Sequence, residues 1–309
     1  MTAKRMTARK NPRKPTVAIV GAGSLATFLA EALGAAGFTI TEIVSRNSPR
    51  SRRRASALAA KVGAQAVTAT SSALDATLLW LCVPDRHIRN SASTLARRLA
   101  ARAAAPTSGR FKSQTNKVRF ALHSSGALLS RELDPLRKAG VAVASVHPLM
   151  TFVAGSHPPL LGVPFAIEGD AEATRVARRI VRDLGGKSFS LKSSRKAAYH
   201  AWATLTSPLL LAFLVTLEEA ARAAGIKPKD AGRMSLPIIR QTLANYSRLG
   251  SARSFSGPLV RGDAQTVAKH LEVLKKHPRV REVYVALARA ALRGLPVKNR
   301  SELERLLRG

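Results

Sequence analysis

Two histidines and one glycine-rich turn are the residues of this sequence whose types and positions favour chemistry. His123 and His147 each follow an apolar run typical of a core strand, and Gly21-x-Gly23-x-x-Ala26 follows a third such run. The charge of histidine changes near neutral pH, and glycines let a backbone approach a phosphate. Because the carboxyl ends of parallel strands meet at one edge of a sheet, we expect these residues to face one crevice. The combination predicts proton transfer beside a bound nucleotide.

The glycine turn has the context of a dinucleotide-binding fingerprint. Residues 17–20 are apolar and mostly β-branched, which predicts a buried strand, and apolar residues recur at helical spacing after the turn. In this fingerprint the first glycine permits a tight turn, the second admits the pyrophosphate, and the small third residue lets helix and strand pack closely. The start of the helix offers unpaired N–H groups to phosphates. The alternative is a tight turn without a ligand. The cofactor contacts predicted here are Gly21, Gly23, Ser24, Leu25 and Ala26.

The end of the second expected strand, residues 38–44, favours NADP over NAD. An acidic residue about 20 residues beyond the fingerprint would bind the 2′-hydroxyl of an NAD ribose. Ser45 and Arg46 stand at that strand end, and Glu42 lies within the strand. An arginine holds a 2′-phosphate through its planar fork, although a solvated basic turn is the alternative. We therefore assign Ser45, Arg46 and Arg50 to a 2′-phosphate, and Val83, Pro84 and Ser124, at further strand ends, to the rest of the cofactor.

The strand patterns end near residue 192, which predicts two domains. Residues 16–192 alternate strands and helices, as expected for a Rossmann-like α/β domain with a doubly wound, mainly parallel sheet. Residues 193–309 are expected to form an all-α domain for substrate binding and dimerisation. Residues 1–15 form a basic tail, and residues 103–117 an exposed loop. The apolar run 205–217 is shorter than the roughly 20 residues of a membrane span. We expect it to be a buried helix, kinked at Pro208, and expect no membrane association.

Polar residues recur on one face of the first C-terminal helix. They are Lys196, His200, Thr204 and Ser207. This face forms either a cleft wall opposite the nicotinamide or a water-bridged surface. Farther on, Arg261 could bind an anionic substrate through two hydrogen bonds, whereas Asp263 has the position of a helix N-cap. The predicted substrate contacts are His123, Ser125, Thr204 and Arg261, and the predicted catalytic residues are His147, His200 and Lys196.

Composition limits the function classes. Hydrophobic residues make up 46% of the chain, and one cysteine, Cys82, excludes a disulfide framework and favours a reducing, cytoplasmic setting. We predict no metal site. The chain carries 51 lysines and arginines against 18 acids, a formal charge of +33. Such a charge attracts polyanions, so non-specific nucleic-acid binding through the basic tail is a secondary hypothesis.

Several segments resemble one family. They are the fingerprint, His123-Ser124-Ser125-Gly126, Ser145 to Phe152, Tyr199-His200 and Gly257 to Asp263. With them the chain resembles bacterial proteins that join a Rossmann-like NAD(P)-binding domain to a helical domain of unknown function. These are regarded as oxidoreductases distantly related to pyrroline-5-carboxylate reductase and deazaflavin-dependent NADP reductase. The resemblance extends from residue 17 to the C-terminus, and members often have asparagine at the position of Pro208.

These observations predict an NADP-dependent oxidoreductase. A hydride would pass between the nicotinamide and a small carbonyl, imine or hydroxy-acid substrate. His147 would transfer the proton, with His200 as the second candidate. The alternative is a non-catalytic NADP-binding sensor or scaffold, which the proline at position 208 favours. We expect a homodimer formed through the C-terminal helices, whose apolar stripe at 280–291 suits an interface.

Overall fold

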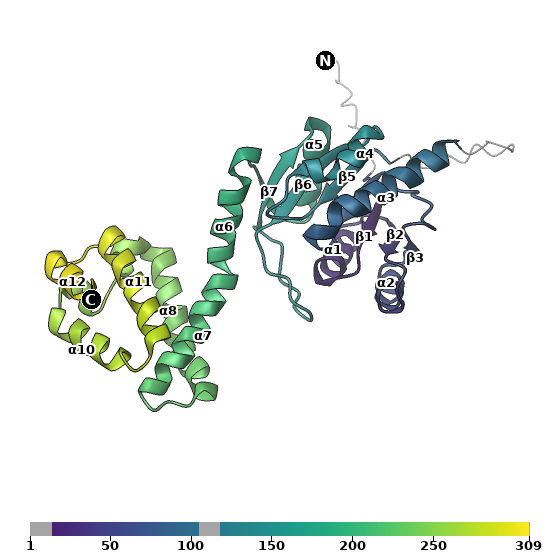
Figure 1. Cartoon of the computed structure of the whole chain (residues 1–309). Helices are drawn as coiled ribbons and strands as arrows, with labels where there is room; N and C mark the ends of the chain where they lie inside the picture. Colours follow the sequence, from purple (N-terminus) through teal and green to yellow (C-terminus); the bar gives the residue numbers. More distant parts are fainter. Residues whose placement is uncertain (1–13, 105–117, 309) are drawn as a thin grey trace, which may run out of the picture. The chain divides into compact units, whose positions relative to one another are not determined.

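The computed structural model describes residues 14–104 and 118–308, and the chain forms two compact units, Met1–Ala203 and Thr204–Gly309 (Figure 1). The helical part was expected to begin at residue 193. The units divide later because the first turn of α6 (Lys196–Thr206) buries Lys196 and Tyr199 within the first unit. The basic tail, apart from Lys14 and Pro15, and most of the expected loop 103–117 lie outside the described residues.

The first unit contains an eight-stranded sheet with the order β3-β2-β1-β4-β5-β6-β7-β8. The strands are β1 (Val17–Val20), β2 (Ile40–Ser45), β3 (Gln65–Thr68), β4 (Leu78–Leu81), β5 (Phe120–His123), β6 (Ala142–Pro148), β7 (Pro164–Gly169) and β8 (Lys187–Ser190). Neighbouring strands are parallel except β6 and β7, which are antiparallel. This confirms the expected Rossmann-like, mainly parallel sheet.

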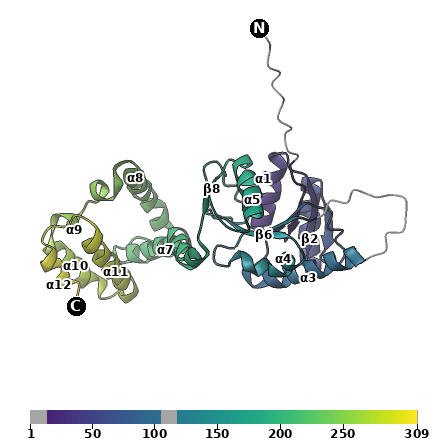
Figure 2. The same ribbon diagram turned by 90° about the horizontal axis from the view of Figure 1, so that it is seen from above.

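Helices cover both faces of this sheet. Figure 2 shows α1 and α5 on one side, and α3 and α4 on the other. Each face has its own apolar core, one centred on Ile19, Trp80 and Phe165 and the other on Leu79 and Leu81. Every residue of β1, β4 and β5 is buried, so the side chains on both faces of these strands need helices to cover them. The helical segments are α1 (Ser24–Ala35), α2 (Pro49–Val62), α3 (Asp85–Ala104), the 3₁₀ turn η1 (Ser130–Leu133), α4 (Asp134–Lys138), α5 (Ala171–Asp183) and the 3₁₀ turn η2 (Ser193–Arg195).

The second unit is helical, as expected. After the end of α6 it contains α7 (Pro208–Ala223), α8 (Pro228–Ser254), α9 (Pro258–Arg261), α10 (Ala264–Leu274), α11 (Pro278–Gly294) and α12 (Arg300–Leu306). Its core joins α10, α11 and α12 through residues such as Val267, Leu292 and Leu303. Asp263 caps α10 by accepting a hydrogen bond from the backbone N–H of Thr266 at 3.0 Å, which confirms its N-cap role.

The apolar run 205–217 is not the buried helix expected from its composition. In the described structure no residue of α7 is buried, and Leu205 and Leu211 are each 63% exposed. An apolar sequence cannot reveal whether the chain itself covers it, which is why the expectation was wrong. By length and composition alone, the helical stretch Ser193–Ala223 could cross a membrane: its mean hydropathy is 1.5 over a window of which no part is buried.

Candidate functional site: a cofactor cavity and a histidine network

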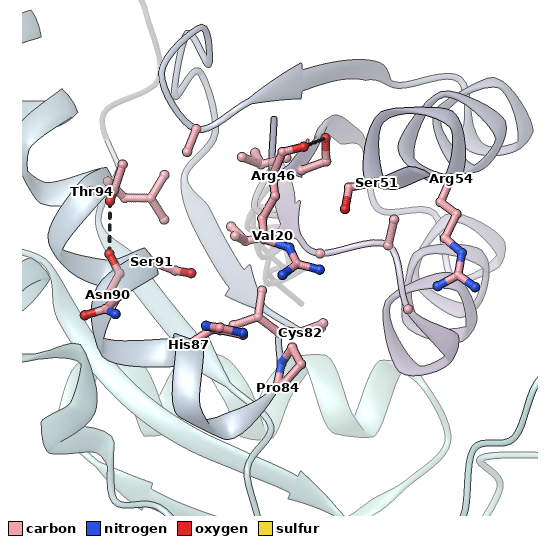
Figure 3. Close-up of a pocket in the computed structure, with 18 residues that line it drawn as sticks. Val20, Arg46, Ser51, Arg54, Cys82, Pro84, His87, Asn90, Ser91 and Thr94 are labelled. Carbon is pink, nitrogen blue, oxygen red and sulfur yellow. Dashed lines mark hydrogen bonds between the residues drawn. The ribbon is translucent and has the colours of Figure 1, made fainter. Parts of the chain in front are cut away.

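A cavity of about 400 Å³ lies at the carboxyl ends of β1, β2 and β4 (Figure 3). The ends of these strands, the start of α2 and one face of α3 form its walls. Lining residues include Gly21, Ala22, Gly23, Ser45, Arg46, Ser51, Arg54, Val83, Pro84, His87, Asn90 and Thr94. This edge of a doubly wound sheet is where dinucleotides bind. The cavity therefore coincides with the expected cofactor site.

The two glycines of the fingerprint have different environments. Gly21 has a φ of +116°, and a Cβ built on it would lie 2.5 Å from the carbonyl oxygen of Cys82, so the turn itself requires glycine there. Gly23 has an ordinary φ of −88°, and a Cβ on it would find no described atom within 4 Å. The space beside Gly23 is therefore open to a ligand. Among the described residues no side chain caps α1, so its N–H groups can bind a phosphate.

The other predicted cofactor contacts near the turn differ in how far they are buried and in what they contact. Ala26 is fully buried against the core, as its packing role requires, and Leu25 packs partly buried against the same core. Ser24 lines an adjacent cavity that shares Gly23. Ser124 is mostly buried and accepts a hydrogen bond from Nε1 of Trp80 at 2.8 Å. These contacts assign Ala26 and Ser124 to packing and leave the backbone at Gly23 as the open part of the turn.

The basic side of the cavity is formed by Arg46 and Arg54, with Ser51 between them (Figure 3). Ser45 is nearly buried, and its hydroxyl donates to the carbonyl oxygen of Arg46 at 3.2 Å. The lining includes Arg54 and not the predicted Arg50. Helix α2 begins at Pro49, and Ser51 and Arg54 lie about one turn apart on the helix face toward the cavity. None of the ion pairs among the described residues involves Arg46 or Arg54.

Glu42, the acid of the second strand, has a structural role. It is almost fully buried and accepts hydrogen bonds from Oγ of Ser72 at 2.6 Å and from the backbone N–H of Ala73 at 2.8 Å. Both carboxylate oxygens therefore hold the segment between β3 and β4. An arginine-lined, acid-free cavity fits the 2′-phosphate of NADP better than the free hydroxyl of an NAD ribose.

His123 is fully buried, which corrects its predicted role in substrate binding. Its Nδ1 accepts a hydrogen bond from the backbone N–H of Ser125 at 3.1 Å, and its Nε2 is paired with the carbonyl oxygen of Leu129 at 3.0 Å. Burial and the charge of Lys196 lower the pKa of His123 to about 4, so the ring is neutral. With both nitrogens occupied, His123 shapes the turn that follows β5.

Ser125 is also occupied by the turn. Its hydroxyl donates to Oδ2 of Asp85 at 2.7 Å and accepts from the backbone N–H groups of Ala127 and Leu128. The one donor and both acceptor positions of this hydroxyl are used within the described structure, and the substrate contact expected at Ser125 stays a prediction. The turn between His123 and Leu128 is instead a rigid, internally bonded platform.

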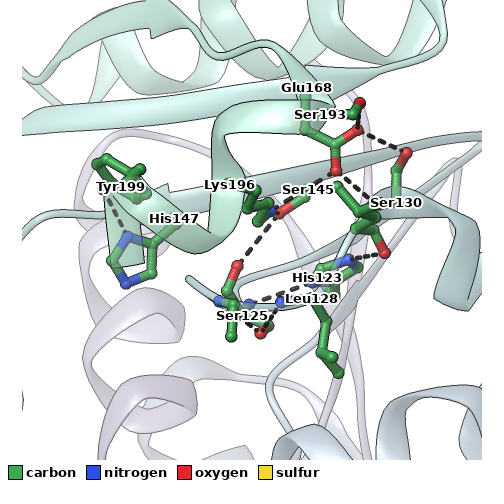
Figure 4. A network of polar contacts seen from close by, with 12 residues as sticks. His123, Ser125, Leu128, Ser130, Ser145, His147, Glu168, Ser193, Lys196 and Tyr199 are labelled. Carbon is green, nitrogen blue, oxygen red and sulfur yellow. Dashed lines mark hydrogen bonds and ion pairs between the residues drawn. The ribbon is translucent and has the colours of Figure 1, made fainter. Parts of the chain in front are cut away.

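His147 and His200 meet at this platform. Their ring centroids are 6.3 Å apart. A Cβ on Gly126 would lie 2.6 Å from Cδ2 of His200 and 2.8 Å from Nε2 of His147, so only glycine fits between the rings and the turn. On its other side, Nδ1 of His147 lies 2.7 Å from the hydroxyl of Tyr199 (Figure 4). Burial, followed by the charges of Lys196 and His200, lowers the pKa of His147 to about 4.

Lys196, on the same helix as His200, is almost fully buried, with only 2% of it exposed. Its Nζ is hydrogen-bonded to Oγ of Ser145 and lies 3.6 Å from Oε1 of Glu168 (Figure 4). Glu168 in turn accepts hydrogen bonds from the N–H of Ser130 at 2.5 Å and its hydroxyl at 2.9 Å, and from Ser193. Burial lowers the pKa of Lys196 to about 8, although Glu168 opposes the shift. Lys196 is thus enclosed among these partners, and its predicted catalytic contact stays a prediction.

The structure also identifies partners that the sequence analysis missed. Tyr199, Glu168, Ser145 and Asp85 all contact predicted site residues. Signals for two of them were present: Tyr199 follows Lys196 at helical spacing, and Ser145 precedes His147 at strand spacing. The remaining predicted substrate contacts, Thr204 on α6 and the exposed Arg261 at the end of α9, belong to the second unit and stay predictions.

Two family models match the chain. Residues 16–104 match the model described as NADP oxidoreductase, coenzyme F420-dependent, and residues 163–291 match a domain of unknown function, DUF2520. The chain therefore combines the two domains that its resemblance implied. None of the curated proteins is significantly similar in sequence.

Solved structures share the fold. A candidate NADP oxidoreductase from Bacteroides fragilis is 22% identical with a TM-score of 0.68, over 90% of this chain and 97% of that one. A reductive aminase from Aspergillus terreus, solved with NADPH and ethyl-5-oxohexanoate, is 15% identical with a TM-score of 0.60, over 95% and 99%. A pyrroline-5-carboxylate reductase from Coxiella burnetii is 13% identical with a TM-score of 0.55, over 95% and 99%. NADP, the cofactor expected from the sequence, stands in the description of the matching family model beside coenzyme F420.

Proposed function

We propose that this chain is an NADP-dependent reductase that passes a hydride between the nicotinamide and a small carbonyl, imine or hydroxy-acid substrate. The observation that carries the proposal is the cavity in which the open backbone of Gly23 lies with the guanidinium groups of Arg46 and Arg54. Backbone N–H groups and arginines are the donors that a pyrophosphate and a 2′-phosphate require. The family model over residues 16–104 supports the same cofactor.

In this proposal different residues hold different parts of the dinucleotide. The turn from Gly21 to Gly23 and the first N–H groups of α1 would bind the pyrophosphate, because this backbone is uncapped and open. Arg46, Ser51 and Arg54 would bind the 2′-phosphate. The cofactor, when bound, supplies the hydride chemistry.

The group proposed to assist the substrate is His147. It lies at the end of β6, at the same edge of the sheet as the cavity and separated from β4 only by β5. With its pKa lowered to about 4, its imidazole is uncharged at neutral pH. A neutral ring is a poor acid but a good hydrogen-bond donor, so its role is to polarise the substrate oxygen or nitrogen on which charge develops. The proton that completes the reduction would then come from water, in place of the proton transfer from His147 expected from the sequence.

The class of substrate is drawn from the fold and its relatives. The names of the reductive aminase and the pyrroline-5-carboxylate reductase describe reductions at carbon–nitrogen bonds by those proteins. We propose the same class here, with carbonyl compounds as the second choice. The test is NADPH oxidation by the purified chain with a panel of cyclic imines and oxo acids. Oxidation with one of them supports a reductase. NADPH binding without turnover of any would favour the binding-only alternative.

We also propose that the chain is a homodimer joined through its second unit. The stripe expected at 280–291 lines, with α7, an apolar cavity of about 590 Å³. Large apolar side chains of α7 and α8 are exposed beside it, among them Leu209, Leu211, Val215, Met234 and Ile238. A gathering of exposed apolar side chains on two neighbouring helices is typical of a site that binds a protein or a membrane. A second copy would cover it.

A further inference from the structure

Helix α6 is attached to strand β6 at two points. Lys196 and Tyr199 are three residues apart on α6 and share one face of the helix, while Ser145 and His147 are two residues apart on β6 and share one face of the strand. Lys196 bonds to Ser145, and Tyr199 bonds to His147. The two pairs form a clamp (Figure 4). His147, a member of this clamp, lies against Gly126.

We infer that Lys196 is a positioning residue, which acts through this clamp on the imidazole of His147, with Tyr199 donating to Nδ1 and the ring proton on Nε2. The inference deepens the proposed function, because it states which atom of His147 would face a substrate. It needs no contact between Lys196 and the substrate. The buried lysine is used for its charge and its place in the fold.

The hydrogen-bond direction follows from the phenol. Burial raises the pKa of Tyr199 to about 12, so its hydroxyl keeps its proton at neutral pH and can donate. If Nδ1 of His147 accepts that hydrogen bond, the single proton of the neutral ring resides on Nε2. Nε2 is the atom that lies closest to the Gly126 turn, 2.8 Å from where a Cβ on that glycine would be. The glycine keeps this donor accessible.

The charges around the ring favour its neutral form. From α6, Lys196 and His200 face His147, and each opposes a positive charge on it. His123, at the end of β5, also interacts with both Lys196 and His147. The nearby acids, Glu168 on β7 and Asp85 on α3, act on Lys196 and stabilise its charged form. The carboxylates thus favour the charged lysine, and the lysine charge adds to burial, the main cause, in favouring the neutral imidazole.

Histidine NMR on the full chain tests this inference without a substrate. In the ¹⁵N-labelled protein at neutral pH, His147, assigned with a His147→Gln variant, should show a protonated Nε2 and an unprotonated Nδ1. Tyr199→Phe should reduce the Nε2-protonated fraction, because Nδ1 loses its donor. A protonated Nδ1 in the unaltered chain would overturn the inference.

A pair of charge variants gives the second test. Lys196→Met removes the charge at nearly the same volume, so the pKa of His147 should rise from about 4 toward its ordinary 6.5, staying below it because burial remains. Lys196→Arg keeps the positive charge, so in that variant the pKa of His147 should stay low. An equal rise in both variants, or no rise in Lys196→Met, would contradict the role of Lys196. If Lys196→Met does not fold, a rise in Lys196→Arg alone overturns it. NADPH binding, measured separately, distinguishes failure of this inference from failure of the proposed function.

Discussion

The hydroxyl of Tyr199 lies 2.7 Å from Nδ1 of His147, and the two rings meet edge to face with their centroids 5.5 Å apart. The contact joins the first turn of α6 to the end of β6. The bond between Lys196 and Ser145 joins the same helix and strand. It fixes the direction of the imidazole and leaves its second nitrogen toward the Gly126 turn. A ring fixed in this way is preorganised to donate, which is the property that stabilises a developing charge.

The first prediction concerns turnover. His147→Ala should lower kcat by about 10²–10³-fold, the usual cost of removing one preorganised donor. Affinity for NADPH should barely change, because His147 does not line the cofactor cavity. Tyr199→Phe, which keeps the packing of the ring, should have a smaller effect on kcat. Steady-state kinetics with the identified substrate would show this. Full turnover in His147→Ala would assign that histidine to packing and leave His200 as the candidate for this role.

The second prediction separates the two fingerprint glycines. Gly23→Val should abolish NADPH binding and leave the fold intact, because the backbone there is extended and the space beside it is open. Gly21→Ala should instead lower the free energy of unfolding, since its Cβ would collide with the Cys82 carbonyl at a positive φ. Gly34→Val is the matched control, because Gly34 is an exposed position on the same helix with no described atom near its Cβ. NADPH fluorescence titration and thermal unfolding measure the two effects. Normal affinity in a folded Gly23→Val would show that the turn is only structural.

The third prediction concerns cofactor choice. Hydrogen bonds to a charged group contribute about 1.5–3 kcal/mol, or roughly 10- to 150-fold in affinity. Arg46→Ala and Arg54→Ala should each weaken NADPH binding by a factor in that range and leave NADH binding nearly unchanged. Arg50→Ala is the matched control. Arg50 lies on α2, as Arg54 does, but does not line the cavity, so its loss should have little effect on NADPH binding. Equal dissociation constants of the unaltered chain for NADPH and NADH would contradict the assignment.

How far the sequence could anticipate this site is clear from its histidines and arginines. The strands and the fingerprint were predictable, because continuous apolar runs and glycine spacing report directly on buried strands and tight turns. His123 and His147 follow similar runs, yet one is enclosed and the other is half-buried. That difference depends on the turn after β5, not on the strand. The buried pair of Lys196 and Glu168 joins elements far apart in sequence, and no local pattern indicates such a contact. Arg54 lines the cavity and Arg50 does not, a difference set by the direction of α2, which proximity to the strand end in the sequence does not report.

The fourth prediction concerns pH. The pKa of His123 is lowered to about 4 in the folded chain, so the unfolded chain binds more protons between about pH 6.5 and pH 4. The stability that this neutral histidine contributes is therefore present above pH 6.5 and is lost as the pH falls toward 4. A shift of this size corresponds to about 3 kcal/mol. Urea unfolding at several pH values should show a smaller acid loss in His123→Gln than in the unaltered chain. An equal loss in both would assign acid sensitivity to other groups.

The last prediction concerns assembly. Leu211 on α7 and Ile238 on α8 are 63% and 69% exposed, and they belong to a wider exposed apolar surface on these helices. A second copy that covers this surface removes it from water, at about 25 cal/mol per Å² of apolar area buried. Leu211→Arg should therefore convert a dimer into a folded monomer, because Leu211 is largely exposed within its own unit. Leu161→Arg is the control: Leu161 is 85% exposed but lies in the first unit, so the assembly should be unchanged. Light scattering at micromolar concentration would report the mass of each variant. A monomeric unaltered chain would reject the dimer, and its binding to phospholipid vesicles would then identify a membrane as what covers these helices.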